Sequence, residues 1–372
     1  MRTSSAALRG ALSGSFDWRW VADVFSNGVR VIQDAPIINP MFNDDASSLV
    51  QGTGSCTITY QGDFGDSIAP AQIGDLLAPF GTQVAVSILV TAGDGFQERV
   101  PMGVYLLTET PSIVTTRFAF QGAIISKGDR IDLQLKDLFY GVQRDRFDAP
   151  SSAPDLSSVW KEVQRLTGLP VTRTVPDGVI TTAVAYQEDK LQAVYDLATV
   201  LDATAALTAD GTVTMRPNVW PAPVATLSYG DGGTLVDVGR AMANDNVYNK
   251  VVVRTNGADG TAILATAEVK SGPLRTTNSD GSLSPYRRVP YFYSSEYITT
   301  QAQAQQFAND YLPRVSRLRS VSVRLTELLN PLRDLGDVLT VNRLGESFTG
   351  RVVSIVRNGS GTQETTVVTN GS

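Results

Sequence analysis

Short stretches in which apolar and polar residues alternate dominate the first third of the sequence, from Trp18 to about Asp137. Alternation with a period of two places every second side chain on the same face, which is the pattern of a half-buried β-strand. Turn signals separate the stretches, and Asn27-Gly28 is among the strongest hairpin signals that a sequence can carry. Many strands joined by tight turns predict an antiparallel barrel or sandwich in this region.

The pattern changes in the middle of the chain. The segment "DLSSVWKEVQRLTGLP" has apolar residues at helical spacing, with Asp155 or Ser157 as the candidate N-cap and Gly168 as a stop. A second helix is predicted in "EDKLQAVYDLATVLDA", and "TAALTADGTVTMRP" predicts a hairpin around Asp210-Gly211. The polar segment before the first helix, "DLFYGVQRDRFDAPSSAPD", is interpreted as a linker or as a loop that leaves one domain. Two helices and a hairpin form a small α+β unit between two β regions.

A second β region begins near Tyr248. The segment "NVYNKVVVRTNGADGTAILATAEV" predicts a hairpin, and "ITTQAQAQQFANDYLPRV" predicts one helix, in which Thr300 and Gln303 have the spacing of a capping box. The chain then ends in "GDVLTVNRLGESFTGRVVSIVRNGSGTQETTVV", a meander of alternating stretches separated by turns. The whole pattern predicts a mainly β fold with an α+β insertion.

The sequence contains no histidine and a single cysteine, Cys56. A Ser-His-Asp triad and a Cys-His pair are therefore excluded, and the commonest transition-metal ligand is missing. A single cysteine also excludes a disulfide within the chain. Cys56 lies in the alternating stretch "GSCTITY", so we interpret it as a buried strand residue and not as a nucleophile.

Paired carboxylates are the remaining catalytic option, and the candidate pairs are Asp44-Asp45 and Glu188-Asp189. Neighbouring residues on a strand point to opposite faces, and acidic residues at a helix start interact favourably with its dipole. A structural role is therefore favoured for both pairs, while a glycan hydrolase would need two acids that converge across a cleft. Several further aspartates lie among glycines without the spacing of a Ca²⁺ loop and are interpreted as turn residues: Asp63, Asp66, Asp94, Asp231 and Asp237.

Two other segments have a functional and a structural interpretation. The aromatic cluster "PYFYSSEY", residues 290–297, fits a sugar-binding platform, but aromatic residues on a strand that covers a core are commoner. The basic stretch from Arg314 to Arg324 alternates with apolar residues and is better interpreted as a polar strand face than as a nucleic-acid patch. The formal net charge of −6 also argues against tight binding to a phosphate backbone. No catalytic, cofactor-binding or metal-binding residue is predicted, and no cofactor.

No stretch approaches the roughly 20 apolar residues of a membrane span, so no span is predicted. Residues 1–15, "MRTSSAALRGALSGS", contain an apolar run that Arg9 interrupts, which does not fit a signal peptide. We interpret them as an amphipathic or disordered arm that becomes ordered on a partner.

The order of these segments resembles the tail hub (baseplate hub) proteins of tailed bacteriophages, particularly the minor tail proteins of phages that infect actinobacteria. The segment "ISKGDRIDLQLKDLFYGVQRDRF" is similar to the exit from the first barrel of such hubs. The segment "DKLQAVYDLATVLDATAALTADGTVTMRP" resembles their inserted unit. Four segments resemble the second barrel of such hubs: "NVYNKVVVR", the helix rich in Ala and Gln, "NPLRDLGDVLTVN" and "GRVVSIV".

The resemblance implies two tube-like antiparallel β-barrel domains plus a small α+β domain. The expected boundaries are an N-terminal arm at 1–15, a first barrel at 16–140, the α+β insertion at 141–235, and a second barrel with one helix at 236–372. The resemblance also implies a structural virion protein at the tip of a phage tail, made in the host cytoplasm, with no catalytic activity. Three copies would form a homotrimeric ring that closes the tail tube and surrounds the channel for tape measure protein and DNA.

The implied partners are the distal tail protein, the tape measure protein, and tail fibre or tip proteins, while DNA passes through the channel without specific binding. Two alternatives stay open at this stage. The first is a distal tail protein, which forms a hexameric ring instead of a trimeric one. The second is a carboxylate-dependent hydrolase of cell-wall or capsule glycans, disfavoured by the absence of histidine and of a nucleophile motif.

Overall fold

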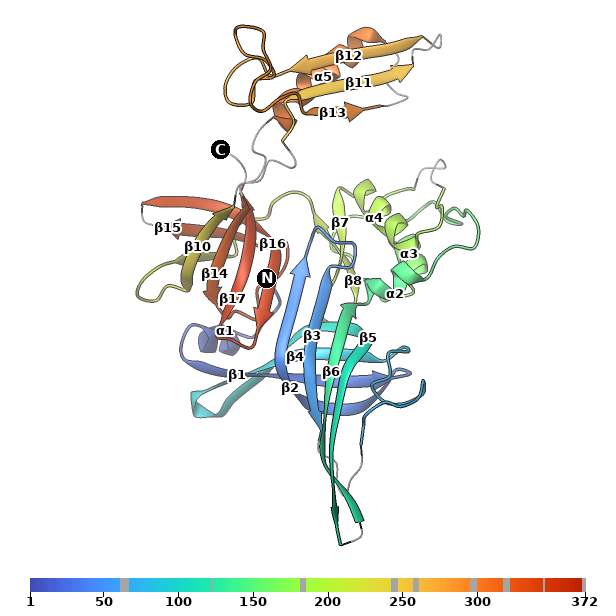
Figure 1. The fold of residues 1–372 in the computed structure, drawn as a ribbon, viewed down its shortest axis with the longest axis vertical. Helices are drawn as coiled ribbons and strands as arrows, with labels where there is room; N and C mark the ends of the chain where they lie inside the picture. The colour runs from blue at the N-terminus through green and yellow to red at the C-terminus, as the bar shows by residue number, and fades with distance from the viewer. Residues whose placement is uncertain are drawn as a thin grey trace. The chain divides into compact units, whose positions relative to one another are not determined.

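The computed structural model describes residues 1–60, 67–121, 123–180, 185–241, 247–256, 261–294, 300–316, 322–343 and 345–369 (Figure 1). The chain divides into two compact units. The first unit contains Met1–Val238 and Leu325–Val367, and the second contains Gly239–Arg324 and Val368–Ser372. The fold is mainly β with small helical insertions, as the sequence predicts.

The first barrel is a closed cylinder of six antiparallel strands. Its strands are β1 (Phe16–Ser26), β2 (Val29–Asp45), β3 (Gly52–Tyr60), β4 (Gln83–Ala92), β5 (Phe96–Phe120) and β6 (Ala123–Asp137). They follow the order β1-β4-β5-β6-β3-β2, and a further pairing between β1 and β2 closes the ring. The predicted turn at Asn27-Gly28 joins β1 to β2 with positive φ angles of 50° and 76°, which confirms this hairpin.

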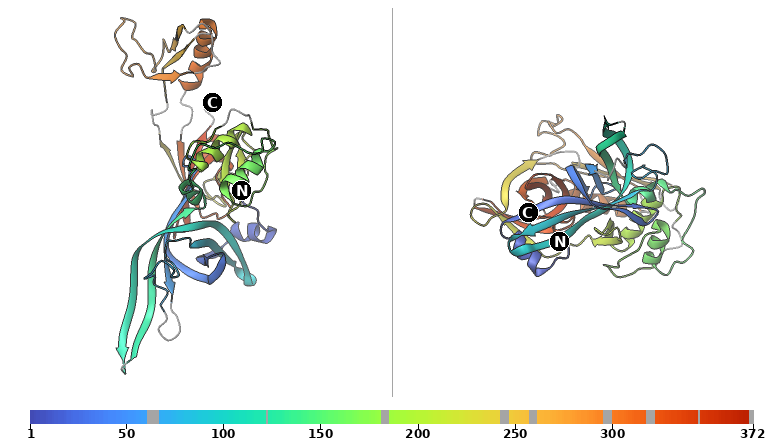
Figure 2. Two further views of the ribbon diagram at one scale, coloured as in Figure 1. Left: turned by 90° about the vertical axis from the view of Figure 1, so that its right-hand side faces the viewer. Right: turned by 90° about the horizontal axis from the view of Figure 1, so that it is seen from below.

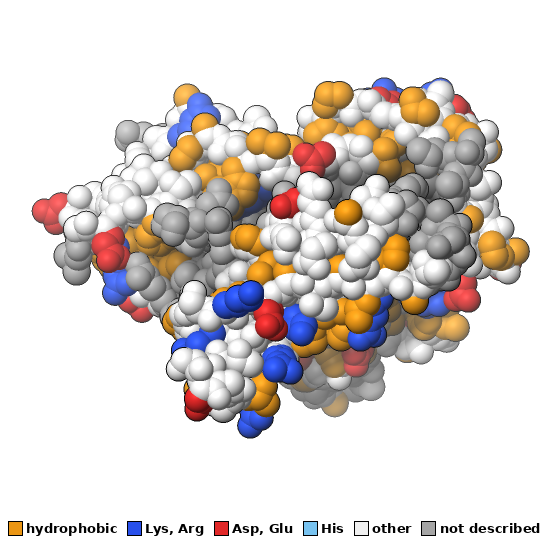
Figure 3. All heavy atoms as spheres, turned by 90° about the horizontal axis from the view of Figure 1, so that it is seen from above, with side chains coloured by type: hydrophobic (Ala, Val, Ile, Leu, Met, Phe, Trp, Pro, Cys, Tyr) orange, Lys and Arg blue, Asp and Glu red, His pale blue; other side chains and the backbone are white. Residues whose placement is uncertain are grey.

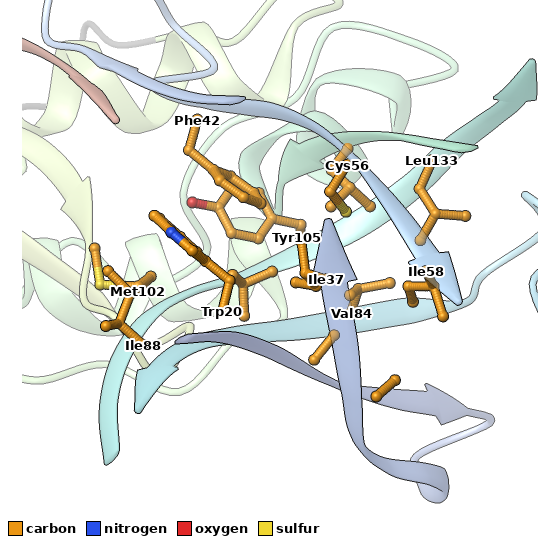
Figure 4. Close-up of a cluster of buried hydrophobic side chains, with 14 of the residues drawn as sticks. Trp20, Ile37, Phe42, Cys56, Ile58, Val84, Ile88, Met102, Tyr105 and Leu133 are labelled. Atoms are coloured by element: carbon orange, nitrogen blue, oxygen red, sulfur yellow. The ribbon is translucent and has the colours of Figure 1, made fainter. Parts of the chain in front are cut away.

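Apolar and aromatic side chains fill the first barrel (Figure 4). The rings of Trp20 and Phe42 stack with their centroids 5.1 Å apart, and Tyr105 tilts against Phe42 at 5.4 Å. Gly54 lies directly below this stack, because a Cβ atom at this position would come within 2.3 Å of the Phe42 ring. The alternation in the sequence therefore places one large apolar side chain after another inside the cylinder.

The second barrel contains the C-terminal meander. Its strands are β9 (Ala225–Ser228), β10 (Leu235–Ala241), β14 (Ser322–Leu328), β15 (Val338–Arg343), β16 (Glu346–Asn358) and β17 (Thr362–Thr369). They follow the order β10-β14-β17-β16-β15-β9, in which β9 runs parallel to β15. Over the described ranges no pairing joins β9 to β10, so this barrel is open where the first barrel is closed.

The two barrels share strands instead of meeting at a loop. The first part of β2 pairs with β1, and its last residues, Met41–Asp45, pair with residues 354–358 of β16. A bulge with Asn39 at a φ of 50° separates the two parts and redirects the strand. Strand β16 is divided in the same way, since its first residues pair with β15. One continuous sheet therefore runs through both barrels.

The α+β insertion consists of α2 (Phe139–Arg144), α3 (Val159–Thr167), α4 (Lys190–Val200), β7 (Ala203–Leu207) and β8 (Val213–Pro217). Its core surrounds the fully buried Trp160, whose indole nitrogen donates to the carbonyl of Val175 at 3.1 Å. The hairpin around Asp210-Gly211 is confirmed as β7–β8. Gly168 ends α3 in the left-handed conformation, as predicted.

Two details of this insertion differ from the prediction. The N-cap of α3 is Ser158, whose hydroxyl accepts from the amide of Lys161. Asp155 does not cap the helix, because its carboxylate accepts from the amide of Ser157 in the turn before it. The segment interpreted as a linker is part of the folded unit: α2 lies in it, and Ser151 exchanges two backbone hydrogen bonds with Tyr186. The apolar residues of α2 are buried, which the polar composition of the segment concealed.

The N-terminal residues contain α1 (Ala6–Leu12), which the hydroxyl of Ser5 caps. Leu8 on this helix is 1% exposed and belongs to the core of the first barrel. Part of the predicted N-terminal segment, residues 1–15, is therefore helical and packed within this chain alone.

The second unit is a three-stranded sheet covered by one helix. Strands β12 (Ala262–Glu268), β11 (Lys250–Asn256) and β13 (Pro290–Tyr293) form the sheet in that order, and α5 (Gln301–Val315) packs on one face. The predicted hairpin β11–β12 therefore forms, but in a sheet of its own and not in the second barrel. The reason is β13, which pairs parallel to β11 and brings the apolar side of α5 onto this sheet.

Polar side chains complete the second unit. The capping box of Thr300 and Gln303 begins α5 as predicted. Further along, Gln301 and Gln305 donate to the carbonyls of Leu264 and Thr266 on the outer edge of β12, at 3.0 and 2.9 Å. These two glutamines occupy acceptors that an exposed edge strand would offer to another chain.

Candidate assembly surface

A buried ion pair lies inside the second barrel. Glu327 on β14 and Arg333 are 0% and 1% exposed, and two hydrogen bonds of 3.1 and 2.7 Å join them. Gln363 and Thr365 on β17 donate to the same carboxylate at 2.9 and 2.7 Å. Burial alone would raise the pKa of Glu327, but the charge of Arg333 and these hydrogen bonds hold that pKa below its ordinary value. The carboxylate of Glu327 is thus fully engaged, whereas the buried Nη1 of Arg333 has no hydrogen-bond partner among the described residues.

A second buried arginine connects the two barrels. Arg357 on β16 is 1% exposed, donates to Asp44 of β2 at 2.8 Å and also donates to the carbonyl of Arg333. The first acid of the pair Asp44-Asp45 therefore belongs to the joint between the barrels. A charge-assisted hydrogen bond across two strands that also pair through their backbones fixes their register.

A small cavity of about 50 Å³ lies at the end of the first barrel, beside the α+β insertion. Asp137 lines it, and its carboxylate accepts from the amides of Gly52 and Phe139 at 2.5 and 3.0 Å. Burial raises the pKa of Asp137 to about 7, and the two amide hydrogen bonds oppose this shift. Basic and acidic groups line the cavity together, with Arg2 and Arg216 facing Asp44, Asp137 and Asp334.

The remaining candidate acids have structural roles. Asp45 accepts from the amide and the hydroxyl of Ser47 in a turn. Glu188 forms an exposed ion pair with Arg146, and Asp189 caps α4 by accepting from the amide of Gln192 at 3.0 Å. Asp44 does converge with other acids, since it lines the small cavity together with Asp137 and Asp334. Its carboxylate is paired with Arg357, however, and a cavity of about 50 Å³ is far smaller than a sugar-binding cleft.

Cys56 is 3% exposed in the core of the first barrel, and burial raises the pKa of its thiol to about 12. It is therefore a thiol at neutral pH, as interpreted from the sequence. Of the glycine-flanked aspartates, Asp63 and Asp66 lie outside the described residues, as does the side chain of Asp94, whereas Asp231 and Asp237 are exposed. No cluster of three potential metal ligands occurs in the described part of the chain.

The aromatic cluster is divided between the two faces of the sheet in the second unit. Tyr291 and Tyr293 pack against α5, where Tyr293 stacks on Phe307 at 4.2 Å. Phe292 points to the other face, is 55% exposed and lies under the guanidinium of Arg254 at 4.5 Å. The favoured core interpretation holds for the two tyrosines. Of the basic stretch from Arg314 to Arg324, residues 317–321 lie outside the described residues, while Arg314 and Val315 end α5 and Ser322–Arg324 begin β14.

The first barrel carries an extension of β5 and β6. The last link between β5 and β4 is the amide of Leu107, which donates to Thr82. Residues 109–115 of β5 still pair with the part of β6 that pairs with β3. Further along, Arg117–Phe120 of β5 pair with Ala123–Ser126 of β6, and no third strand of the described residues joins them; we call this ribbon the arm. Figure 2 shows the arm leaving the barrel as two strands. Ile113 and Val114 are 40% and 52% exposed although they point to opposite faces.

The second barrel presents a different kind of open edge. Strand β9 pairs only with β15 and strand β10 only with β14, so within the described ranges each has one unpaired side. We call this opening, from β9 through residues 229–234 to β10, the seam. Val236 on β10 is 49% exposed beside the exposed Asp237. Unpaired strand edges are templates for pairing with another chain, so the arm and the seam are the candidate assembly surfaces.

Two observations concern the surface and the helices of the described residues. On the face shown in Figure 3, basic and acidic side chains are interspersed among apolar and neutral ones. In the described part of the chain, no helix combines the length and the apolar character that a bilayer crossing needs.

The fold that these barrels and their insertion define is that of phage tail proteins. The structure is similar to the tail protein from Neisseria meningitidis MC58, with a TM-score of 0.58 and 13% identity over 95% of this chain and 97% of that chain. It is also similar to the 43 kDa tail protein of prophage MuSo2 from Shewanella oneidensis, with a TM-score of 0.55 and 14% identity over 94% and 98% of the two chains. No protein-family model and no curated protein matches the sequence. The resemblance to tail proteins is thus confirmed for the fold.

Proposed function

We propose that this protein is a structural component of a phage virion, a trimeric tail hub at the tip of the tail. The hub closes the tail tube and forms part of the channel for tape measure protein and DNA. The observation that carries the proposal is the pair of barrels joined by β2 and β16 within one chain. Three such chains would place six barrels around one axis, which matches a sixfold tube with a threefold ring.

The proposed role needs assembly and no catalysis. Of the groups considered as catalytic, Asp189 caps a helix, Asp44 forms an ion pair and Cys56 fills the core of the first barrel. A wall that DNA passes should lack a continuous cationic track, because tight phosphate contacts would slow its passage. The net charge of −6 is compatible with such a wall. Distal tail protein, tape measure protein and tail fibre or tip proteins are the proposed partners in the virion, and synthesis takes place in the host cytoplasm.

The proposal includes the expected domain boundaries at residues 140 and 235. The two barrels would face the channel and the α+β insertion would lie outside the ring. A lumen wall built from the insertion would contradict this arrangement.

Electron cryo-microscopy of assembled tails tests the proposal directly. We expect three copies per ring at the tail tip, with both barrels of each copy lining the channel. Six copies per ring would instead support a distal tail protein. Turnover of cell-wall or capsule glycans by the purified protein, abolished by changing one Asp or Glu, would replace the structural role with a hydrolase.

A further inference from the structure

We infer that the second unit binds the phosphate backbone of DNA through a basic surface at one end of its sheet. This surface consists of the side chains of Lys270, Arg287 and Arg288, and we call it the basic end. The contact is independent of base sequence and weakens as salt is added. It goes beyond the proposed hub, which needs a channel for DNA but no binding site, and it involves neither barrel.

The charge of the chain is unevenly divided between its two units. In sequence, residues 239–324 of the second unit contain 11 Lys and Arg against 6 Asp and Glu, a formal net charge of +5. The rest of the chain contains 20 Lys and Arg against 31 Asp and Glu, a formal net charge of −11. The overall charge of −6 therefore conceals a cationic unit. Such an asymmetry within one chain is typical of a protein with a polyanionic partner.

One buried side chain gathers basic residues around the start of β11. Asn249 is 0% exposed, and its side-chain nitrogen donates to the carbonyls of Leu274 and Arg287 at 3.0 and 2.6 Å. Its side-chain oxygen accepts from the amide of Val289 at 2.8 Å, and its backbone carbonyl accepts from the amide of Val269 at 2.9 Å. Each of these four partners is a basic residue or adjoins one in sequence. The basic residues brought together in this way are Lys270, Arg275, Arg287 and Arg288.

Three of these four side chains are exposed and lack a counter-charge. Arg275 is half-buried and donates to the carbonyl of Gly272 within the loop. Glu268, two residues before Lys270, already pairs with Lys250 at 3.6 Å. The basic end itself forms no ion pair with a described residue. Its three charges are therefore available to an anion from outside the chain.

The basic end fits a polymer of closely spaced charges better than it fits a single anion. No hydrogen bond to a described residue holds its three side chains in place, so they do not form a shaped pocket for one carboxylate or phosphate group. Duplex DNA presents one negative charge per about 1.7 Å of its axis, and Lys and Arg side chains bind it by releasing its counterions. DNA is also the polyanion that passes through the proposed hub.

The experiment compares the full chain with two variants that have the same net charge as each other. The first variant removes the basic end by Lys270→Gln, Arg287→Asn and Arg288→Gln. Asn replaces Arg at position 287 because the φ angle there is 65°, which Asn tolerates better than most residues. The control variant removes three exposed arginines of the first unit by Arg9→Gln, Arg19→Gln and Arg130→Gln.

Fluorescence anisotropy of a labelled duplex of about 20 base pairs measures the binding between about 25 and 100 mM salt. Three phosphate contacts predict that the affinity of wild type falls about 40-fold over this range, because log affinity falls with log salt with a slope of about −0.9 per contact. The control variant should keep this slope. The first variant should lose at least about tenfold in affinity at the lowest salt concentration and show a flatter slope. Circular dichroism and melting show that both variants are folded.

Equal affinity of wild type and the first variant for the duplex, or no binding at the lowest salt concentration, overturns the inference while the proposed hub stands. Tighter binding of poly-L-glutamate or of anionic lipid vesicles than of the duplex also overturns it, because the partner would then be an acidic protein or a membrane. The proposed hub fails separately, if assembled tails contain six copies per ring.

Discussion

The first and the second barrel have six strands each and share one sheet, yet their interiors are built from different chemistry. The first barrel is closed and filled by a stack of Trp20, Phe42 and Tyr105. The second is open at the seam and contains the buried pair of Glu327 and Arg333 among its apolar residues. Apolar packing is tolerant of small shifts in position, whereas a buried ion pair requires one geometry in which all hydrogen bonds are made.

This difference shows how a chain can separate stability from specificity. Burial of apolar surface in the first barrel supplies a core that closes without help. In the second barrel, Glu327 joins β14 to β17 through Gln363 and Thr365, so the network specifies which strands are neighbours. We expect the two interiors to respond differently to substitution and to pH.

The largest effect is expected from breaking the ion pair. Arg333→Met leaves the buried carboxylate of Glu327 without its counter-charge, which should lower the free energy of unfolding by about 3–5 kcal/mol. The double variant Glu327→Gln with Arg333→Met removes both charges and keeps an acceptor for Gln363 and Thr365, so it should recover most of the loss. Chemical denaturation of wild type, Arg333→Met and the double variant measures the loss and its recovery. Equal losses in the single and double variants would show that the pairing is not what stabilises the second barrel.

The pH dependence of stability should differ between the barrels. The folded pKa of Asp137 is raised to about 7, so its contribution is complete below its unfolded pKa near 4 and is lost as the pH rises through 7. Wild type should lose roughly 3 kcal/mol from this group between pH 5 and 8, and Asp137→Asn should remove that slope. Glu327 has a lowered pKa and acts in the opposite direction, since its contribution is lost as the pH falls below its unfolded pKa.

Melting temperatures from pH 3 to 9 for wild type, Asp137→Asn and Glu327→Gln measure both slopes. The comparison fails if Asp137→Asn still loses stability as the pH rises from about 5 to 8. It also fails if the melting temperature of Glu327→Gln falls in acid as much as that of wild type.

The smallest effect is expected from overpacking the first barrel. Gly54→Ala would place a Cβ atom within 2.3 Å of the Phe42 ring, and the stack must move to accept it. We expect a loss of about 1–3 kcal/mol, seen as a lower denaturation midpoint with an unchanged slope. Gly74→Ala is the control, because no atom lies within 4 Å of the added methyl group. A neutral result for Gly54→Ala would mean that the aromatic stack is as adaptable as a loosely packed core.

The strands and helices were predictable because their signals are local. Alternation identified the strands of the first barrel, Asn27-Gly28 its first hairpin, and Thr300 with Gln303 the start of α5. The buried position of Cys56 followed from the same alternation. These features depend on residues that are close in sequence, so one chain is sufficient to infer them.

The long-range features could not be inferred in this way. The buried partner of Asp44 is Arg357, which is 313 residues away in sequence, and only the pairing of β2 with β16 brings them together. The separate sheet of the second unit depends on β13, a strand of four residues whose parallel pairing leaves no periodic signal. The stretch "SIVTTRFAFQGAIISKGDR" predicts strands like its neighbours, and only the absence of a third strand among the described residues shows that its middle part leaves the barrel.

Strand β16 belongs to both barrels, and this has a mechanical consequence. A load that pulls the barrels apart meets a covalent backbone that continues from one into the other, together with the ladder from Ser354 to Asn358 against β2. To separate them, that ladder must be sheared along its length, with several hydrogen bonds breaking together. A loop joining two barrels would act as a hinge and yield one contact at a time. Joined in this way, the barrels transmit tension as a single stiff element.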